Sequence, residues 1–228
     1  MSNSIAPPRA NYFIGLKLPI TTELTNSVYA IQQEIRERNN LLSKIFSKPN
    51  KLHLTLAVLH IDQEERIPEA IEIFQNSINE LRTLLDDNYI SFPTIKAFGA
   101  YNNWRVIWLE PENGLTYNKI LQYGNYISTK FTEASFPSTP SDVLHATIAN
   151  KYSNKKLHIK ETDYRDLTHH LTSLPCQQLN QIDLLKIGET DPFTGYYPSL
   201  SCLYIHPPES SSEESKSDSN MIVVDDDL

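Results

Sequence analysis

Apolar and polar residues alternate from Lys51 to Leu59, which is the pattern of a half-buried β-strand. On such a strand His53, Thr55 and Ala57 would share one face, and the apolar side chains would share the other. The pattern therefore places an imidazole and a hydroxyl side by side, facing away from the core. The expected apolar face consists of Leu52, Leu54, Leu56 and Val58.

The same alternation returns from Val143 to Ala149. There His145 and Thr147 would face away from the core. Two imidazoles with pKa values near neutrality can divide the roles of acid and base, and a Thr hydroxyl can donate to a phosphate oxygen. The repeated pattern therefore predicts one site to which both strands contribute. The core-facing residues of this second strand would be Leu144, Ala146 and Ile148.

The remaining periodicity predicts helices and strands in both halves of the chain. Apolar residues spaced by three and four from Ile67 to Leu85 predict one long helix, and Thr21 or Thr22 would cap an earlier one. This mixture predicts an α+β fold with largely antiparallel sheets. Further helices are expected near residues 113–131 and 161–171, and strands near 12–18, 89–98, 104–109, 179–187 and 196–205, with Trp104 and Trp108 in the core.

The segments His53-Leu54-Thr55-Leu56 and His145-Ala146-Thr147-Ile148 share the pattern His-x-Thr-apolar. This pattern resembles that of the 2H phosphoesterase superfamily, which includes LigT-like 2′-5′ RNA ligases and cyclic phosphodiesterases. The central domain of A-kinase anchoring protein 7 is the most similar type, and the resemblance covers roughly residues 10–206. It also rests on Asn11-Tyr12-Phe13-Ile14, Gln181-Ile182-Asp183-Leu184 and Gly195-Tyr196-Tyr197.

The resemblance implies two pseudo-symmetric lobes with largely antiparallel sheets, flanked by helices and separated by a central cleft. It implies metal-independent cleavage of short RNA, 2′-5′-linked oligoadenylate or a 2′,3′-cyclic phosphate end. His53 and His145 would be the catalytic base and acid, in an order that the sequence leaves open. Thr55 and Thr147 would hold the non-bridging phosphate oxygens. Further candidate substrate contacts are Tyr12, Arg105, Lys151, Tyr196 and Tyr197, the last two by stacking on a base.

Two alternatives to cleavage follow from the same residues. Ligation is the reverse reaction and would use the same acid and base. A non-catalytic nucleotide- or RNA-binding adaptor would use the pocket for binding and the acidic tail to recruit a partner. Two intact His-x-Thr motifs favour catalysis, because a binding module has no need for two acid–base groups.

Composition and motifs narrow the remaining classes. A chain of 228 residues with 39% hydrophobic residues can bury a sizeable core. The net charge is −8, but residues 207–228 hold seven acidic side chains and one lysine, so the rest is close to neutral and broad capture of a nucleic-acid duplex is not favoured. The sequence contains no H-E-x-x-H, G-x-x-x-x-G-K-S/T or G-x-S-x-G motif. We expect no cofactor and no metal ligand, with His169 and His170 on a solvated helix face.

We expect the chain to divide into a flexible leader at residues 1–10, a phosphoesterase-like domain at 11–206 and a disordered, acidic, Ser-rich tail at 207–228. In this tail, Ile222, Val223 and Val224, followed by Asp225, resemble a SUMO-interaction motif, in which apolar residues add a strand to a partner sheet. The alternative is an unbound, solvated tail. Two isolated cysteines, no signal peptide and no long apolar run predict an intracellular protein of the cytoplasm or nucleus, monomeric and without membrane contact.

Overall fold

The computed structural model describes residues 8–85, 88–100, 103–150 and 164–206, without the side chains of 97–100, 103–105 and 165. Lys151, the side chain of Arg105 and the predicted SUMO-interaction motif therefore lie outside the described part of the chain. Within that part, no helix is both long and apolar enough to cross a membrane.

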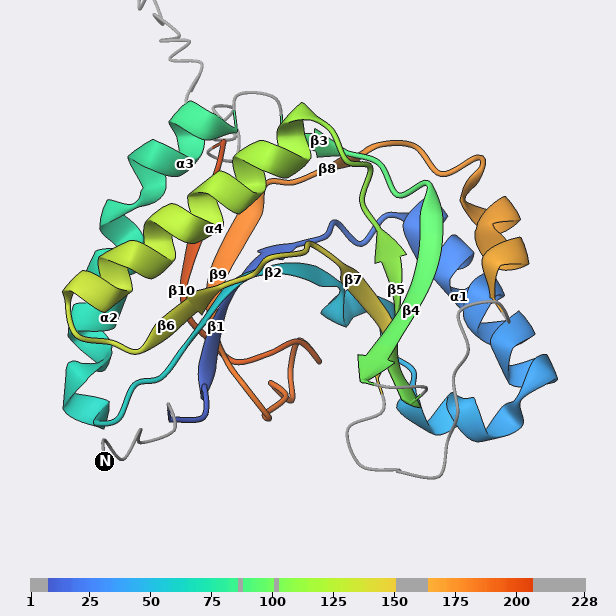
Figure 1. Cartoon of the computed structure of the whole chain (residues 1–228), viewed down its shortest axis with the longest axis horizontal. Coiled ribbons are helices and arrows are strands. Elements are labelled where there is room, and N and C mark those ends of the chain that lie inside the picture. The colour runs from blue at the N-terminus through green and yellow to red at the C-terminus, as the bar shows by residue number, and fades with distance from the viewer. Residues whose placement is uncertain (1–7, 86–87, 101–102, 151–163, 207–228) are drawn as a thin grey trace, which may run out of the picture.

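Eight strands form one curved antiparallel sheet in the order β10-β9-β1-β2-β7-β5-β4, and β6 also pairs with β2 (Figure 1). Strands β3 and β8 form a separate two-stranded pair. This arrangement confirms the predicted α+β fold with antiparallel strands. The strands are β1 Tyr12–Lys17, β2 His53–Leu59, β3 Tyr89–Ile90, β4 Thr94–Ala100, β5 Asn103–Glu110, β6 Ser138–Pro140, β7 Ala146–Asn150, β8 Gln177–Gln178, β9 Gln181–Lys186 and β10 Ser199–Tyr204.

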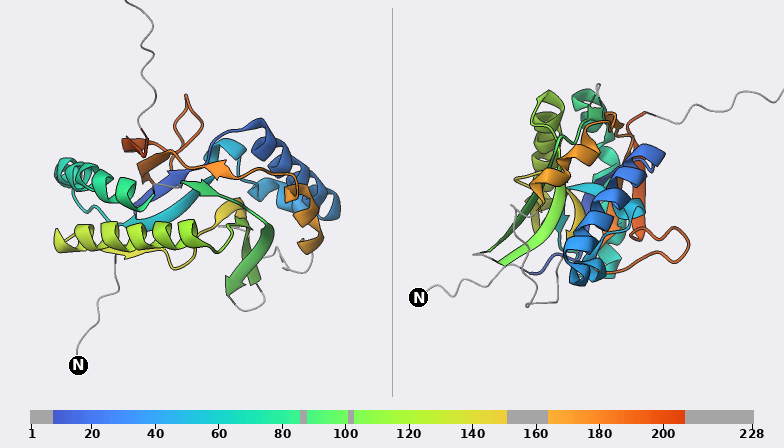
Figure 2. Two further views of the ribbon diagram at one scale, coloured as in Figure 1. Left: turned by 90° about the horizontal axis from the view of Figure 1, so that it is seen from above. Right: turned by 90° about the vertical axis from the view of Figure 1, so that its right-hand side faces the viewer.

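Each of the two long helices packs on the half of the sheet that does not contain the strand before it (Figures 1 and 2). Helix α1 (Thr22–Arg38) follows β1 but reaches β7, where the amide of Gln32 donates to the carbonyl of Ile148 at 3.1 Å. Helix α4 (Leu115–Glu133) follows β5 but packs on β2 and β6. Each half is therefore covered by a helix that the chain forms on leaving the other half. The main core fills the space between the helices and one face of the sheet.

The predicted helix from Ile67 to Leu85 is wrong as a single element. It is divided at Ser77 into α2 (Ile67–Asn76) and α3 (Ile78–Leu84). Ser77 is buried, and its hydroxyl donates to the carbonyl of Phe74 and hydrogen-bonds with the hydroxyl of Tyr123, both at 2.6 Å. Ile78, Leu81 and Leu85 still pack on the core after the break, which is why the apolar spacing continues through it.

Two other elements differ from the prediction, one in continuity and one in type. The expected strand over residues 89–98 is divided into β3 and β4. The expected helix near 161–171 is the 3-10 helix η5 (Arg165–Leu171) in the described residues, and the stretch before β2 contains two more, η1 (Asn40–Ile45) and η2 (Pro49–Lys51). A fourth, η3 (Glu64–Arg66), precedes α2.

A β-bulge at Leu56 interrupts the pairing between β1 and β2. Two consecutive residues of β1, Ile14 and Gly15, pair with Ala57 and Thr55, so Leu56 is the extra residue of β2. A bulge changes the alternation of side chains by one position in the strand that contains it.

The bulge corrects the predicted faces of β2 beyond Leu56. Ala57 is buried and Val58 packs on the opposite side, against the small cluster of Phe13, Leu185 and Tyr196. The sequence assigns these two residues the other way round, because strict alternation takes no account of an extra residue.

Helix α4 lies close to β2 at Gly124. A Cβ atom at this position would lie 2.8 Å from the carbonyl oxygen of Leu56, which is too close for any side chain. The same carbonyl accepts a hydrogen bond of 2.8 Å from the backbone N–H of Ser141. A glycine therefore allows the helix, the bulge and the segment before β7 to meet without any of them shifting.

Candidate active site

The two His-x-Thr motifs meet at the junction of the two halves of the sheet. Leu54 and Ala146 pair across β2 and β7, and both are fully buried in the main core. Because side chains alternate along a strand, the residues that flank this pair point to the other face. In antiparallel register those flanking residues meet as His53 with Thr147 and His145 with Thr55.

We call the face of the sheet that carries these four residues the histidine face. All four residues are partly buried there. His53 and His145 are diagonal neighbours, and such neighbours lie roughly 7–8 Å apart in antiparallel pairs. This spacing leaves room for one phosphate group between the two imidazoles, with a Thr hydroxyl on either side. The structure thus brings together the four residues that the sequence singles out most strongly.

His53 is held in one orientation by the chain that precedes it. Its Nδ1 lies 2.8 Å from the carbonyl oxygen of Lys51. A carbonyl only accepts hydrogen bonds, so Nδ1 carries the proton and Nε2 keeps its lone pair. The ring also contacts Phe13 at 4.9 Å and the edge of Tyr197 at 5.3 Å between centroids.

Burial lowers the pKa of His53 to about 4, against the opposing effect of the Lys51 carbonyl, and the charge of His145 lowers it further. The imidazole is therefore neutral at neutral pH. A neutral imidazole with a free Nε2 is the form that accepts a proton.

His145 has the same local arrangement on the other strand. Its Nδ1 lies 3.3 Å from the carbonyl of Val143, and burial lowers its pKa. The ring of Trp108, which is buried as predicted, lies beside it with centroids 5.8 Å apart. Together these residues border a mostly apolar cavity of about 410 Å³. Its lining consists of Trp108, Ser141, Asp142, Val143 and His145.

Two lysines near His53 were not predicted from the sequence. Lys17 pairs with His53 across β1 and β2, and its Nζ lies 4.8 Å from the ring centre of Tyr196. Lys51 lies 4.9 Å above the ring of Tyr197, and burial followed by the charge of Lys48 lowers its pKa. Both cations can attract phosphate to this end of the histidine face, and the buried carboxyl of Asp183 offsets part of the charge of Lys17.

A turn after β9 positions Tyr197 against His53. Asp191 accepts hydrogen bonds from the backbone N–H groups of Phe193 and Thr194, and the amide of Asn50 donates to the carbonyl of Thr194 at 2.9 Å. Gly195 has a φ of +68°, which glycine adopts without strain. Phe193 at the tip is 96% exposed.

The structure corrects the roles predicted for two tyrosines. Tyr196 is only 5% exposed and packs against Phe13 and Leu185, so its face is closed to a stacking base. Its hydroxyl is buried without a hydrogen-bond partner among the described residues. Tyr12 is buried in the main core, on the opposite side of β1 from Phe13, so it cannot reach a phosphate on the histidine face. Tyr197 is only partly buried and stays at the site.

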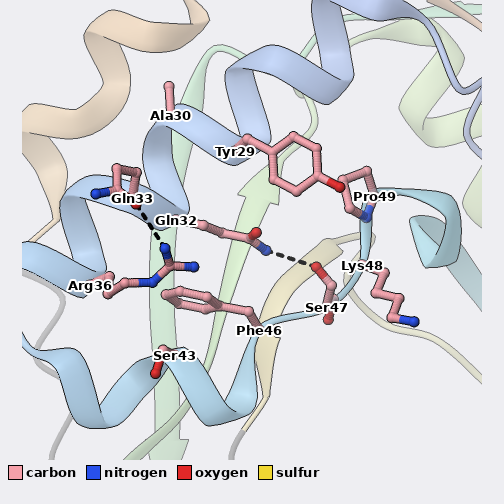
Figure 3. A pocket seen from close by; sticks show the side chains of 10 residues that line it. All are labelled: Tyr29, Ala30, Gln32, Gln33, Arg36, Ser43, Phe46, Ser47, Lys48 and Pro49. Carbon is pink, nitrogen blue, oxygen red and sulfur yellow. Dashed lines mark hydrogen bonds between the residues drawn. The ribbon is translucent and has the colours of Figure 1, made fainter.

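A larger cavity of about 470 Å³ lies away from the histidines, between α1 and residues 43–49 (Figure 3). Gln32 donates there to the carbonyl of Ser47 at 2.7 Å, and Arg36 donates to Gln33 at 2.8 Å. None of the residues that line it belongs to the His-x-Thr motifs. The chemistry that the sequence predicts is therefore not located in this cavity.

Comparison with known proteins identifies the family to which this fold and these paired motifs belong. The profile of the family described as the AKAP7 2′5′ RNA ligase-like domain matches residues 10–205. The chain belongs to this family, within the 2H phosphoesterase superfamily, and it is a phosphoesterase of the 2H type.

Two kinds of relative accompany this match. An RNA 2′,3′-cyclic phosphodiesterase of Bacillus subtilis (strain 168) is 26% identical over 149 residues, which are 64% of this chain and 74% of that protein. The crystal structure of TT0787 of Thermus thermophilus has a TM-score of 0.51 at 16% identity, covering 86% of this chain and 97% of that one. The apo structure of Escherichia coli LigT has a TM-score of 0.46 at 16% identity, covering 86% and 96% respectively.

Proposed function

We propose that this protein is a metal-independent phosphodiesterase for short RNA, acting on 2′-5′-linked oligonucleotides or on 2′,3′-cyclic phosphate ends. The observation that carries the proposal is the pair of imidazoles on the histidine face, each anchored through Nδ1 to a carbonyl two residues before it. This anchoring leaves both Nε2 atoms for proton transfer. The names of the family and of the B. subtilis relative support RNA as the substrate.

We assign the base to His53 and the acid to His145. His53 has the shorter carbonyl contact and a pKa of about 4, which keeps it neutral and able to accept a proton. In the reaction, Nε2 of His53 takes the proton of the attacking ribose hydroxyl or water as its oxygen bonds to phosphorus. The P–O bond to the leaving group then breaks, and Nε2 of His145 donates a proton to the departing oxygen. His145 does so from its protonated form, which its lowered pKa makes the minor form at neutral pH.

The residues around the two histidines bind different parts of the substrate. Thr55 and Thr147 hold the non-bridging oxygens as negative charge increases on them. The cavity beside Trp108 has the mostly apolar lining that suits the flat ring of a nucleobase, so we place one base there. Lys17 and Lys51 attract the phosphate from the His53 side.

The test is turnover in the presence of a chelator with 2′-5′ and 3′-5′ oligoadenylates and 2′,3′-cyclic nucleotides, with products identified by mass. We expect His53→Ala and His145→Ala each to lower kcat by about 10²–10⁴-fold, as for loss of a positioned acid or base. His60→Ala is a matched control, because His60 Nδ1 also contacts a carbonyl, that of Arg9, away from the site.

A substrate with a better leaving group separates the two roles. On a nucleoside 2′- or 3′-(4-nitrophenyl phosphate), whose leaving group needs no proton, His145→Ala should keep most of the activity and His53→Ala should not. The opposite result would reverse the assignment. Binding of nucleotides without turnover of any substrate would favour the adaptor, and joining of ends would favour ligation.

A further inference from the structure

A cluster of three metal-ligating side chains lies outside the histidine face, where η5 meets α1. Glu34 is on α1, and His169 and His170 are adjacent on η5. The ligand atoms of these three side chains all lie within 4.8 Å of one another. Residues more than 130 positions apart in the sequence thus bring two imidazoles and one carboxylate to a single point.

The three groups converge on one carboxylate oxygen. Nε2 of His170 hydrogen-bonds to Oε1 of Glu34, and Nε2 of His169 lies 3.6 Å from the same oxygen. Ligands around a tetrahedral zinc ion, at 2.0–2.1 Å from the metal, are about 3.3 Å apart. Only small side-chain movements are therefore needed to place an ion among the three atoms.

Neighbouring residues orient the ligands as in many metal sites. Nδ1 of His169 lies 2.6 Å from the carbonyl of Asp166, so it carries the proton and leaves the lone pair on Nε2. Arg38 lies 3.4 Å from Oε2 of Glu34, which leaves Oε1 for an ion.

The charges of the cluster favour a cation. Arg38 forms an ion pair with Asp166, to which it donates through both terminal guanidinium nitrogens, Nη1 and Nη2. Glu34, Arg38 and Asp166 together contribute a net charge of −1 to the cluster. The side chain of His169 is 60% exposed, so an ion can enter from solvent.

We infer that Glu34, His169 and His170 form a binding site for a divalent transition-metal ion of the zinc class, with water as the fourth ligand. Two imidazoles and one carboxylate suit Zn²⁺, Co²⁺, Ni²⁺ or Cu²⁺ better than Ca²⁺ or Mg²⁺. The ion takes the place of the proton between Nε2 of His170 and Glu34. A neutral ring keeps that proton by moving it to Nδ1, and a protonated ring releases it to solvent, so Nε2 binds the ion as part of a neutral imidazole. The site joins η5 to α1 on the helix-covered side of the sheet (Figures 1 and 2). Because the histidine face is the other side of the sheet, the ion takes no part in phosphate cleavage.

The test uses the full chain, stripped of metal and titrated with Co²⁺. We expect the visible absorption of four-coordinate cobalt at one equivalent, lost on addition of Zn²⁺. Zn²⁺ at 100 times its Kd should raise Tm by about 5–10 °C. His169→Asn, His170→Asn and Glu34→Gln should each weaken Co²⁺ binding at least tenfold.

Matched controls distinguish this site from other ligands in the chain. Glu37→Gln removes a neighbouring exposed carboxylate of α1, and His60→Asn removes a histidine elsewhere. Both should bind Co²⁺ as the unchanged chain does. Loss of the absorption in His53→Ala or His145→Ala, with His169→Asn unaffected, would move the ion to the histidine face and overturn the inference. So would the absence of any absorption, which would leave the cluster a hydrogen-bonded ion pair. Neither result depends on turnover, so the proposed phosphodiesterase is tested separately.

Discussion

The two imidazoles share one local hydrogen-bond arrangement, which the His-x-Thr pattern encodes within a few residues. In both cases Nδ1 contacts the carbonyl of the residue two positions earlier, Lys51 for His53 and Val143 for His145. This hydrogen bond needs only an extended backbone and a histidine. This is why short sequence patterns suffice to find both residues before any tertiary structure is known.

Residues that depend on long-range pairing could not be found in this way. Lys17 is part of the site only because β1 pairs with β2 in a register that includes a bulge. Tyr196 and Tyr197 are adjacent in sequence, yet one is buried and the other borders His53. The sequence predicts the same role for both. The turn at residues 191–195, which orients them, depends on a contact with Asn50, which lies far away in the sequence.

The depressed pKa of His53 predicts a dependence of stability on pH. Between pH 6.5 and about 4 the unfolded chain binds a proton at this residue that the folded protein does not. The free energy of unfolding therefore decreases as the pH falls through this window, by up to about 3 kcal/mol, and the residue adds no slope above it. Urea unfolding at pH 7, 6, 5 and 4.5 measures this.

His53→Gln is the comparison, because carboxylates also titrate in part of the same range. The difference in unfolding free energy between the original protein and this variant should shrink as the pH falls from 6.5. A difference that stays constant from pH 7 to pH 4.5 would contradict the depressed pKa.

At the level of elements, the close approach of α4 to β2 links stability to the site. Gly124→Ala would gain about 1 kcal/mol in helix propensity. It would also push against the Leu56 carbonyl, and overpacking of this kind costs about 1–3 kcal/mol. We expect a net loss of stability of up to about 2 kcal/mol. Activity should decrease as well, because the same carbonyl holds Ser141 at the edge of the His145 cavity.

Asn125→Ala is the matched control, since Asn125 is exposed on the same helix. It should keep or slightly increase the free energy of unfolding. Chemical unfolding and turnover of the preferred substrate are measured for both variants. A Gly124→Ala protein as stable and active as the original would show that the helix and the bulge can move apart freely.

The secondary structure was predictable where the pattern is local and regular. Helix α1 begins as predicted, with Thr21 accepting a hydrogen bond from the backbone of Leu24. The division of the next predicted helix was not predictable, because Ser77 is held by Tyr123, 46 positions later in the chain. The bulge at Leu56 has the same origin, since the helix that fits against it comes from the other half.

At the level of the whole molecule, the tail remains a separate prediction. Replacing Ile222, Val223 and Val224 with Ala in the full chain should abolish binding of SUMO in a calorimetric titration, because these side chains would add a strand to the partner sheet. Ser217→Ala and Ser219→Ala are controls that keep the apolar stretch and should bind normally. Equal affinity of the original and altered tails would leave no role for the motif.

The position of β1 has a consequence for the order in which the protein can form during synthesis. This strand lies between β2 and β9, so one of its neighbours is nearby in the chain and the other follows more than 160 residues later. Until β9 has been made, the hydrogen-bonding edge of β1 stays open, and such edges are prone to pair with other chains. The ribosome must therefore release nearly the whole domain before the strand beside His53 is protected, and its folding rate is governed by contacts that close last.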